Sequence, residues 1–179
     1  MSDWLVILPV ICPLIIASLA VIAWRNPIQR GLCLVGITLA VVSAGALFIE
    51  VLANGPMAMA MGNWPAPFGI VFVADLLGAS LALTSSIVGL GVAIYSLGDI
   101  NRAQWTAGFY PLLAFLLTGV NGAFLTGDIF NLYVWFEVIL IASFGLMVIG
   151  GRREQLDGAI KYAFLNLLAT TFFLIATGL

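Results

Sequence analysis

One stretch of the sequence decides the fold: Ile129-Phe130-Asn131-Leu132-Tyr133-Val134-Trp135-Phe136-Glu137-Val138-Ile139-Leu140-Ile141-Ala142. It lies in an apolar run long enough to cross a bilayer, and one charged residue, Glu137, stands near the middle of that run. A charged side chain at that depth costs about 2.5–3.5 kcal/mol on insertion scales. Because the chain carries few other charges, we interpret Glu137 as a functional group. The alternative is a structural carboxyl bonded to a neighbouring helix.

The composition of the chain excludes several classes of protein. Of its 179 residues, 63% are hydrophobic and 8% are charged, which a soluble domain of this size cannot accommodate, so the surrounding solvent has to be lipid. The net charge of −2 makes nucleic acid an unsuitable partner. The chain has no histidine, and its two cysteines, Cys12 and Cys33, form no CxxC motif. We therefore expect no cofactor, no metal site and no disulfide framework.

Six apolar runs are each long enough to span a membrane, and they predict an all-α, polytopic integral membrane protein. These runs cover residues 4–23, 31–53, 72–97, 108–126, 129–149 and 157–179. The connection Thr126-Gly127-Asp128 is so short that the fourth and fifth helices should be antiparallel neighbours. On the second run, Gly36, Ala40 and Ala44 recur every four residues, a spacing that allows another helix to approach closely.

The basic residues predict the orientation of the chain. They all lie in the first, third and fifth connections or at the start of the sixth helix: Arg25, Arg30, Arg102, Arg152, Arg153 and Lys161. By the positive-inside rule this face is cytoplasmic, so both termini should lie outside. Asp3, Glu50, Asp75 and Asp128 cluster toward that outer side. We expect a multi-pass protein of the cell (plasma) membrane, with its basic loops in the cytoplasm.

The connection between the second and third runs, residues 54–70, is the long outer loop. Met57, Met59 and Met61 alternate there with small residues. We interpret this period of two as a strand that leads into a turn at Trp64-Pro65-Ala66-Pro67, giving a short hairpin-like loop. The alternative is a methionine cluster that binds copper.

Lys161 is the obvious cation to pair with Glu137, but the expected depths of the two residues do not match. Counted from the cytoplasmic helix ends, Glu137 should lie about 18 Å deep and Lys161 about 4–5 Å, a gap of about 13 Å that the two side chains do not close. Lys161 therefore either extends to the membrane interface or forms the cytoplasmic end of a proton path through water.

The other polar residues of the expected helices have two interpretations each. Asp128 is either the N-cap of the fifth helix or an outer entry for cations. Asp75 and Glu50 are either interfacial charges or part of an acidic mouth that attracts cations. Asn121 either bonds between helices or holds water, and the same alternatives apply to residues of the sixth run: Asn166, Thr170 and Thr171.

Three segments of the sequence resemble one family. The run from Phe124 to Val138, FLTGDIFNLYVWFEV, closely resembles the D subunit of Mrp-type multisubunit sodium/proton antiporters. The segments Asn63-Trp64-Pro65-Ala66-Pro67-Phe68-Gly69-Ile70 and Phe109-Tyr110-Pro111-Leu112-Leu113 resemble the same protein. A more distant similarity extends to the antiporter-like, proton-pumping subunits of NADH:quinone oxidoreductase and of membrane-bound hydrogenases.

The resemblance implies a role for Glu137 and a partner for it. In the family, the acid of the fifth helix belongs to the proton path and is paired with a lysine on a broken seventh helix. Family members have about fourteen spans, so the six expected here correspond to the N-terminal portion of a larger antiporter-like fold, as a fragment, a truncated product or a split subunit. Residues 1–107 would form an N-terminal three-helix segment, and residues 108–179 the first three helices of the proton-conducting repeat.

Three functions follow as expectations. The first is a membrane subunit of a multisubunit sodium/proton antiporter, a transporter and not an enzyme, in which protons cross through Glu137, with other subunits, protons and sodium as its partners. The second is a proton-pumping membrane subunit of an NADH:quinone oxidoreductase or a membrane-bound hydrogenase. The third is a truncated assembly piece that transports nothing.

Overall fold

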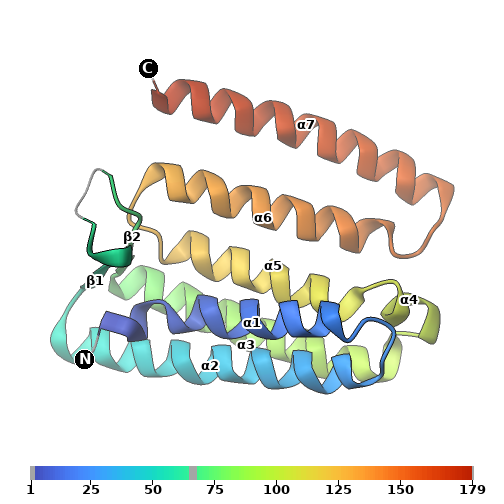
Figure 1. Ribbon diagram of the computed structural model, residues 1–179, viewed down its shortest axis with the longest axis horizontal. Coiled ribbons are helices and arrows are strands. Elements are labelled where there is room, and N and C mark those ends of the chain that lie inside the picture. Colours follow the sequence, from blue (N-terminus) through green and yellow to red (C-terminus); the bar gives the residue numbers. More distant parts are fainter. Residues whose placement is uncertain (1–2, 65–67, 179) are drawn as a thin grey trace.

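The computed structural model describes residues 3–64 and 68–178, and most of these residues are helical (Figure 1). The elements in chain order are η1 (Asp3–Val6), α1 (Leu8–Ile22), α2 (Ile28–Asn54), β1 (Met57–Ala60), η2 (Met61–Asn63), β2 (Val71–Ala74), α3 (Leu76–Asp99), α4 (Arg102–Thr106), α5 (Phe109–Phe124), α6 (Ile129–Val148) and α7 (Arg153–Gly178). The described part of the chain is thus all-α apart from one pair of short strands.

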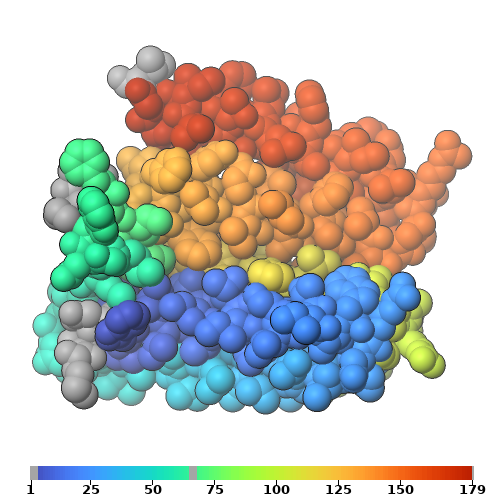
Figure 2. All heavy atoms as spheres, viewed as in Figure 1, coloured from blue at the N-terminus to red at the C-terminus, as the bar shows by residue number. Residues whose placement is uncertain are grey.

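The long helices lie side by side, with the strands at one end and α4 at the other (Figure 1). α1 packs on α2 and α5, and α3 packs on α2 and α5, so these four helices form one bundle. α6 packs on α5, and α7 packs on α6 at the edge of the molecule. Figure 2 shows that α1 and α6 cover most of α5 on this face. The position of α6 therefore depends on α5.

Each predicted span corresponds to one of the six main helices, but two of these helices are shorter than the other four. α2, α3, α6 and α7 are long and apolar enough to cross a membrane by length and composition, among the residues that the structure describes. α1 and α5 are apolar helices of 15 and 16 residues. A multi-pass membrane protein is supported, whereas the count of six spans stays a prediction. The division at residues 107 and 108 also stays a prediction, since α5 packs on α1, α3 and α6 alike.

Three of the expected helix starts are wrong. The first helix was expected from residue 4, but Asp3–Val6 forms the 3-10 helix η1 and α1 begins at Leu8. The third helix was expected from residue 72, but Val71–Ala74 is a strand and α3 begins at Leu76, after Asp75 caps it. The sixth was expected from residue 157, but α7 begins at Arg153, because Glu154 in the first turn suits the positive end of the helix dipole. An apolar run in the sequence indicates the residues that lipid surrounds. A helix can extend beyond that run into water, so the ends of the run are not the ends of the helix.

The strand pair joins the long loop to the turn between α5 and α6. β1 and β2 are antiparallel, with Met57 opposite Ala74. The N–H of Val73 donates to the carbonyl of Leu125 at 2.8 Å, and Phe72 forms a bridge with Thr126. The three methionines of the loop pack on the apolar cluster that contains Phe72. The expected turn at 64–67 falls partly on residues 65–67, which lie outside the described residues.

The small residues of the second predicted span do allow close packing. A Cβ atom on Gly36 would lie 2.6 Å from the side chain of Ile16 on α1, and Ala40 and Ala44 are fully buried. The connection before α5 holds a helix that was not predicted, α4, whose start has a capping box made by Asn101 and Gln104.

Candidate functional site

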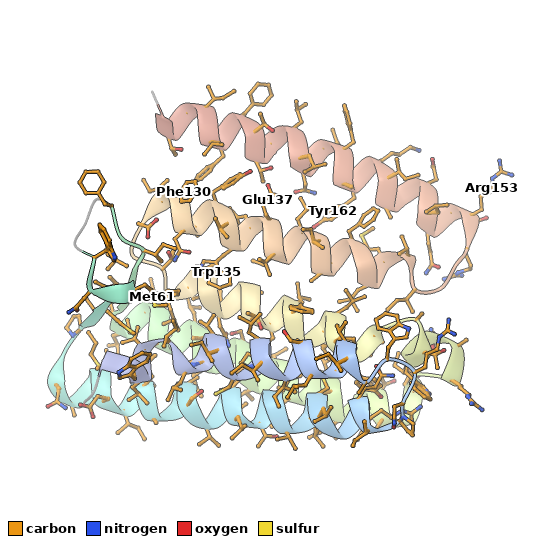
Figure 3. The ribbon with its side chains drawn as sticks, in the orientation of Figure 1. Met61, Phe130, Trp135, Glu137, Arg153 and Tyr162 are labelled. Carbon is orange, nitrogen blue, oxygen red and sulfur yellow. The ribbon has the colours of Figure 1, made fainter. Side chains whose placement is uncertain are left out.

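Glu137 lies on α6, on the side of the helix that faces away from α5. α6 starts at Ile129 because the carboxylate of Asp128 accepts a hydrogen bond from the N–H of Asn131 at 2.6 Å. Eight residues after Ile129, Glu137 is well inside the apolar part of the helix. Figure 3 shows Trp135 pointing toward α5 and Glu137 pointing toward α7. Two residues turn a helix by about 200°, which explains why the two side chains lie on opposite sides.

Glu137 is partly buried, and its carboxylate has no polar partner among the residues that the structure describes. Within residues 3–64 and 68–178, no hydrogen bond or ion pair to this carboxylate is found. Beside it, Phe136 makes an edge-to-face contact with Phe173 of α7, with ring centroids 6.1 Å apart. The interpretation of Glu137 as a structural carboxyl bonded to a neighbouring helix therefore gains no support from the described contacts.

The interface between α6 and α7 carries polar side chains along its length. The hydroxyls of Ser143 and Tyr162 are 3.2 Å apart, and the amide of Asn166 donates to the carbonyl of Tyr162 at 2.9 Å. Thr170 is partly buried and lies one turn beyond Asn166. Asn166 thus bonds within its own helix among the described contacts, and its expected role in holding water stays a prediction.

Lys161 has a partner other than Glu137. Its ammonium lies 2.6 Å from the carboxylate of Asp157, one turn nearer the start of α7, and its side chain is 71% exposed. The contacts between α6 and α7 keep Lys161 and Glu137 at different depths, because Ser143 meets Tyr162 and Phe136 meets Phe173. Lys161 stands beside Tyr162, whereas Glu137 stands beside Phe136 and six residues before Ser143, which is about 9 Å along the helix. The expected difference in depth therefore agrees with these contacts.

The three acids of the predicted outer entry each have a local hydrogen bond. Asp75 caps α3 by accepting from the N–H of Gly78 at 2.6 Å. Asp128 caps α6, as one of its two interpretations predicted, and its second oxygen accepts from the N–H of Val71 at 3.2 Å. Glu50 accepts from the side-chain amide of Asn54 at 2.8 Å. Their role as an entry for cations stays a prediction. No group of three or more histidine, cysteine, aspartate or glutamate side chains is placed to hold a metal in the part of the chain that the structure describes.

Asn121 is the polar residue whose environment the sequence did not reveal. It is fully buried on α5, and its amide nitrogen donates to the carbonyl of Pro9 at 3.0 Å and to the hydroxyl of Ser86 at 3.1 Å. Its amide oxygen accepts from the hydroxyl of Ser85 at 2.7 Å. Asn121 therefore bonds between helices, the first of its two expected interpretations. The sequence signal for its partner was Pro13, which frees a carbonyl inside α1.

Comparisons with known proteins identify the family. No protein-family model matches the chain. The D subunit of the Na(+)/H(+) antiporter of Alkalihalophilus pseudofirmus is 43% identical over 175 residues, which is 96% of this chain, and the protein of the same name from Bacillus subtilis is 39% identical over 97% of it. The chain is a homologue of the D subunits of Mrp-type antiporters. It spans 35% of the length of these curated relatives.

Solved structures agree with the assignment of this D-subunit homologue. A chain of the Mrp complex from Dietzia sp. DQ12-45-1b superposes with a TM-score of 0.86 and 27% identity, covering 99% of this chain and 34% of that one. A chain of the membrane-bound sulfane sulfur reductase, an archaeal respiratory membrane complex, superposes with a TM-score of 0.88 and 25% identity, covering 95% of this chain and 35% of that one. The resemblance stated from the sequence is thereby confirmed, for the family and for the wider group.

Proposed function

We propose that this chain is part of a membrane subunit of a multisubunit sodium/proton antiporter, and that protons cross the membrane through the carboxyl group of Glu137. The observation that carries the proposal is the position of this carboxylate. It lies inside a membrane helix, partly buried, with no hydrogen-bonding partner among the described residues. A charged group at this depth raises the free energy of membrane insertion, and such groups in membrane helices usually have a function. The homology to D subunits of Na(+)/H(+) antiporters supports the proposal.

A carboxyl group in this position suits proton transfer for a physical reason. Apolar surroundings favour a neutral carboxyl group, whereas a nearby cation or a chain of water molecules favours the carboxylate. A group exposed alternately to these two influences binds and releases a proton. Polar side chains along the interface of α6 and α7, Ser143 and Tyr162 among them, are placed to hold such water.

The arrangement in the membrane belongs to the same proposal. All six long helices would span the plasma membrane, with the basic connections in the cytoplasm and the strand pair outside. Both described ends of the chain lie at the same end of the molecule as the strand pair (Figure 1), which agrees with an even number of spans. Other subunits of the complex would be the protein partners, and protons and sodium the transported ions.

Substitution of Glu137 tests the proposal. In the complete complex in everted membrane vesicles, Glu137→Gln should abolish the sodium-dependent change in internal pH, because glutamine does not titrate. The matched control is Glu154→Gln, which removes an exposed carboxylate in the first turn of α7, outside the apolar run, and it should retain exchange. If Glu137→Gln vesicles still exchange sodium for protons, the proposed role of this residue is wrong.

The second candidate is a proton-pumping subunit of a redox complex, which the superposition on the archaeal respiratory complex favours. The same vesicles separate the two functions by what drives the proton movement. A sodium or potassium gradient drives it in an antiporter, and an electron donor drives it in a redox complex. If neither drives it, the third function, an assembly piece that transports nothing, replaces both.

A further inference from the structure

Three residues of α5 hold the segment of α6 that carries the candidate carboxylate. We infer that Asn121, Gly119 and Gly122 are positioning residues for Glu137: Asn121 fixes α5 to α1 and α3, and the two glycines fix α6 to α5. The inference rests on the proposed proton-transfer role of Glu137. It assigns a function to a helix that itself carries no charged side chain.

The hydrogen bonds of Asn121 link α5 to α1 and α3. Pro13 lies inside α1 and has no N–H, so the carbonyl of Pro9, four residues earlier, loses its partner within the helix. In lipid, an unpaired backbone carbonyl is costly and needs another donor. Asn121 supplies it at 3.0 Å and also bonds Ser85 and Ser86 of α3. One side chain thus joins three helices.

The two glycines, Gly119 and Gly122, bring α5 into close contact with α6. A Cβ atom on Gly119 would lie 2.7 Å from the Cγ1 atom of Ile139 and 3.1 Å from its backbone nitrogen. A Cβ atom on Gly122 would overlap the indole ring of Trp135. Neither neighbour is the far end of a flexible side chain, so a methyl group at either position has to push α6 away from α5.

The contacts of the glycines bracket Glu137. Trp135 precedes Glu137 by two residues and Ile139 follows it by two, and both face α5 while Glu137 faces the other way (Figure 3). A displacement of this segment away from α5 therefore moves the carboxylate relative to α7 and to any water there. In enzymes, a misplacement of about 1 Å costs on the order of 100-fold in rate, and a proton transfer depends on distance in the same way.

Simple helix packing is the competing explanation, and it predicts a different result. If the glycines serve only to pack the helices, alanine at these positions lowers the amount of assembled complex but leaves the surviving complexes with normal pH dependence. If they position Glu137, the assembled complexes transport slowly and their pH profile is displaced, because the surroundings of the carboxylate change.

The experiment uses the complete complex with Gly119→Ala, Gly122→Ala and Asn121→Leu. The readouts are the exchange rate per assembled complex across a range of pH and the pH dependence of the labelling of Glu137 by dicyclohexylcarbodiimide, measured by mass spectrometry. We expect each variant to lose at least about ten-fold in rate and to displace both pH profiles. The matched control is Gly91→Ala on α3, where a Cβ atom meets nothing within 4 Å, and it should behave as the parent.

A double substitution tests the link between Asn121 and Pro13. Pro13→Ala returns an N–H to α1, which can bond the carbonyl of Pro9 in place of Asn121. Pro13→Ala together with Asn121→Leu should therefore recover about three-fold or more of the rate that Asn121→Leu alone loses. Additive losses in the two variants would contradict the role of the Pro9 carbonyl.

The failure of this inference differs from the failure of the proposed function. If Glu137→Gln retains exchange, the proton-transfer role fails, whatever the α5 variants do. If Glu137→Gln abolishes exchange but the three α5 variants match Gly91→Ala in rate and in labelling, positioning by α5 is wrong and the proposed function stands. The labelling also reports on Glu137 when transport is too slow to measure.

Discussion

Asp128 gives the most direct test of how the structure is held together at the end of the molecule that carries the strands. One oxygen of its carboxylate accepts from the N–H of Asn131 at 2.6 Å, and the other accepts from the N–H of Val71 at 3.2 Å. The first bond caps α6, and the second ties the α5–α6 turn to β2. Asp128→Ala removes both bonds and leaves two amide groups without partners.

The cost of this substitution follows from the two bonds. Loss of an N-cap costs about 1 kcal/mol. Loss of a partner for a partly buried amide costs about 1–3 kcal/mol more. We therefore expect Asp128→Ala to lower the free energy of unfolding by about 2–4 kcal/mol. Asp128→Asn keeps a capping oxygen but presents an NH2 group to Val71, so its cost should be near that of the second bond alone.

The assay is the thermal stability of the detergent-solubilised complex, followed by size-exclusion chromatography after heating. Asp75→Ala is the matched control, because Asp75 caps α3 through Gly78 and makes no second bond among the described contacts. The order of stability should be parent, then Asp75→Ala, then Asp128→Ala. If Asp75→Ala destabilises the complex as much as Asp128→Ala, the bond to Val71 contributes nothing and the reasoning is refuted.

The same variants separate the cap from the cation entry. If Asp128 serves only as a cap, Asp128→Asn should leave the sodium concentration for half-maximal exchange unchanged. If Asp128 attracts cations at the outer mouth, removal of its charge should raise that concentration at low ionic strength and much less at high salt, because salt screens exposed charges.

Three further predictions follow from the structure. Asp157→Asn breaks an exposed ion pair of the i,i+4 type and should lower the free energy of unfolding by no more than about 0.5 kcal/mol. Lys161→Gln should slow exchange if Lys161 is the cytoplasmic end of a proton path. Equal exchange rates in Lys161→Gln and the parent would exclude that path. Tyr162→Phe removes the bond to Ser143 and should cost about 0.5–1.5 kcal/mol, while Tyr95→Phe, at a side chain 72% exposed, should be neutral; a neutral Tyr162→Phe would show that this bond does not hold α7. In intact cells, a membrane-impermeant maleimide should label Ala58→Cys on β1 and leave Ala103→Cys on α4 unlabelled, and the reverse pattern would invert the proposed orientation.

Features that depend on the local sequence pattern, such as helices and their caps, could be predicted from the sequence. The apolar run around Glu137 predicted a helix with the acid inside it, and Asp128 before that run gave the cap as one of two interpretations. The start of α3 was missed because Val71–Ala74 is as apolar as the helix that follows, and a short apolar run does not distinguish a buried strand from a helix. The start of α7 was missed because Arg153 and Glu154 lie outside the apolar run but still inside the helix.

The environment of Glu137 depends on contacts between residues far apart in the chain, which local pattern does not reveal. Pro13 frees a carbonyl in α1, a signal that the sequence prediction did not use, and the proline alone does not indicate which residue bonds that carbonyl. The donor, Asn121, stands 112 positions after Pro9. The contacts of Gly119 and Gly122 with α6 likewise required the register of two antiparallel helices.

The packing of α6 explains why Glu137 points where it does. The helix needs one face for α5, and two bulky side chains on that face, Trp135 and Ile139, pack directly against glycines of α5. Because Glu137 stands two residues from each of them, about 200° around the helix, it has to face away from α5. This orientation excludes an ion pair between Glu137 and the bundle of α1, α2, α3 and α5, so a partner of Glu137 has to approach from the side of α7. We expect water or a cation there, because an unpaired carboxylate in lipid costs several kcal/mol.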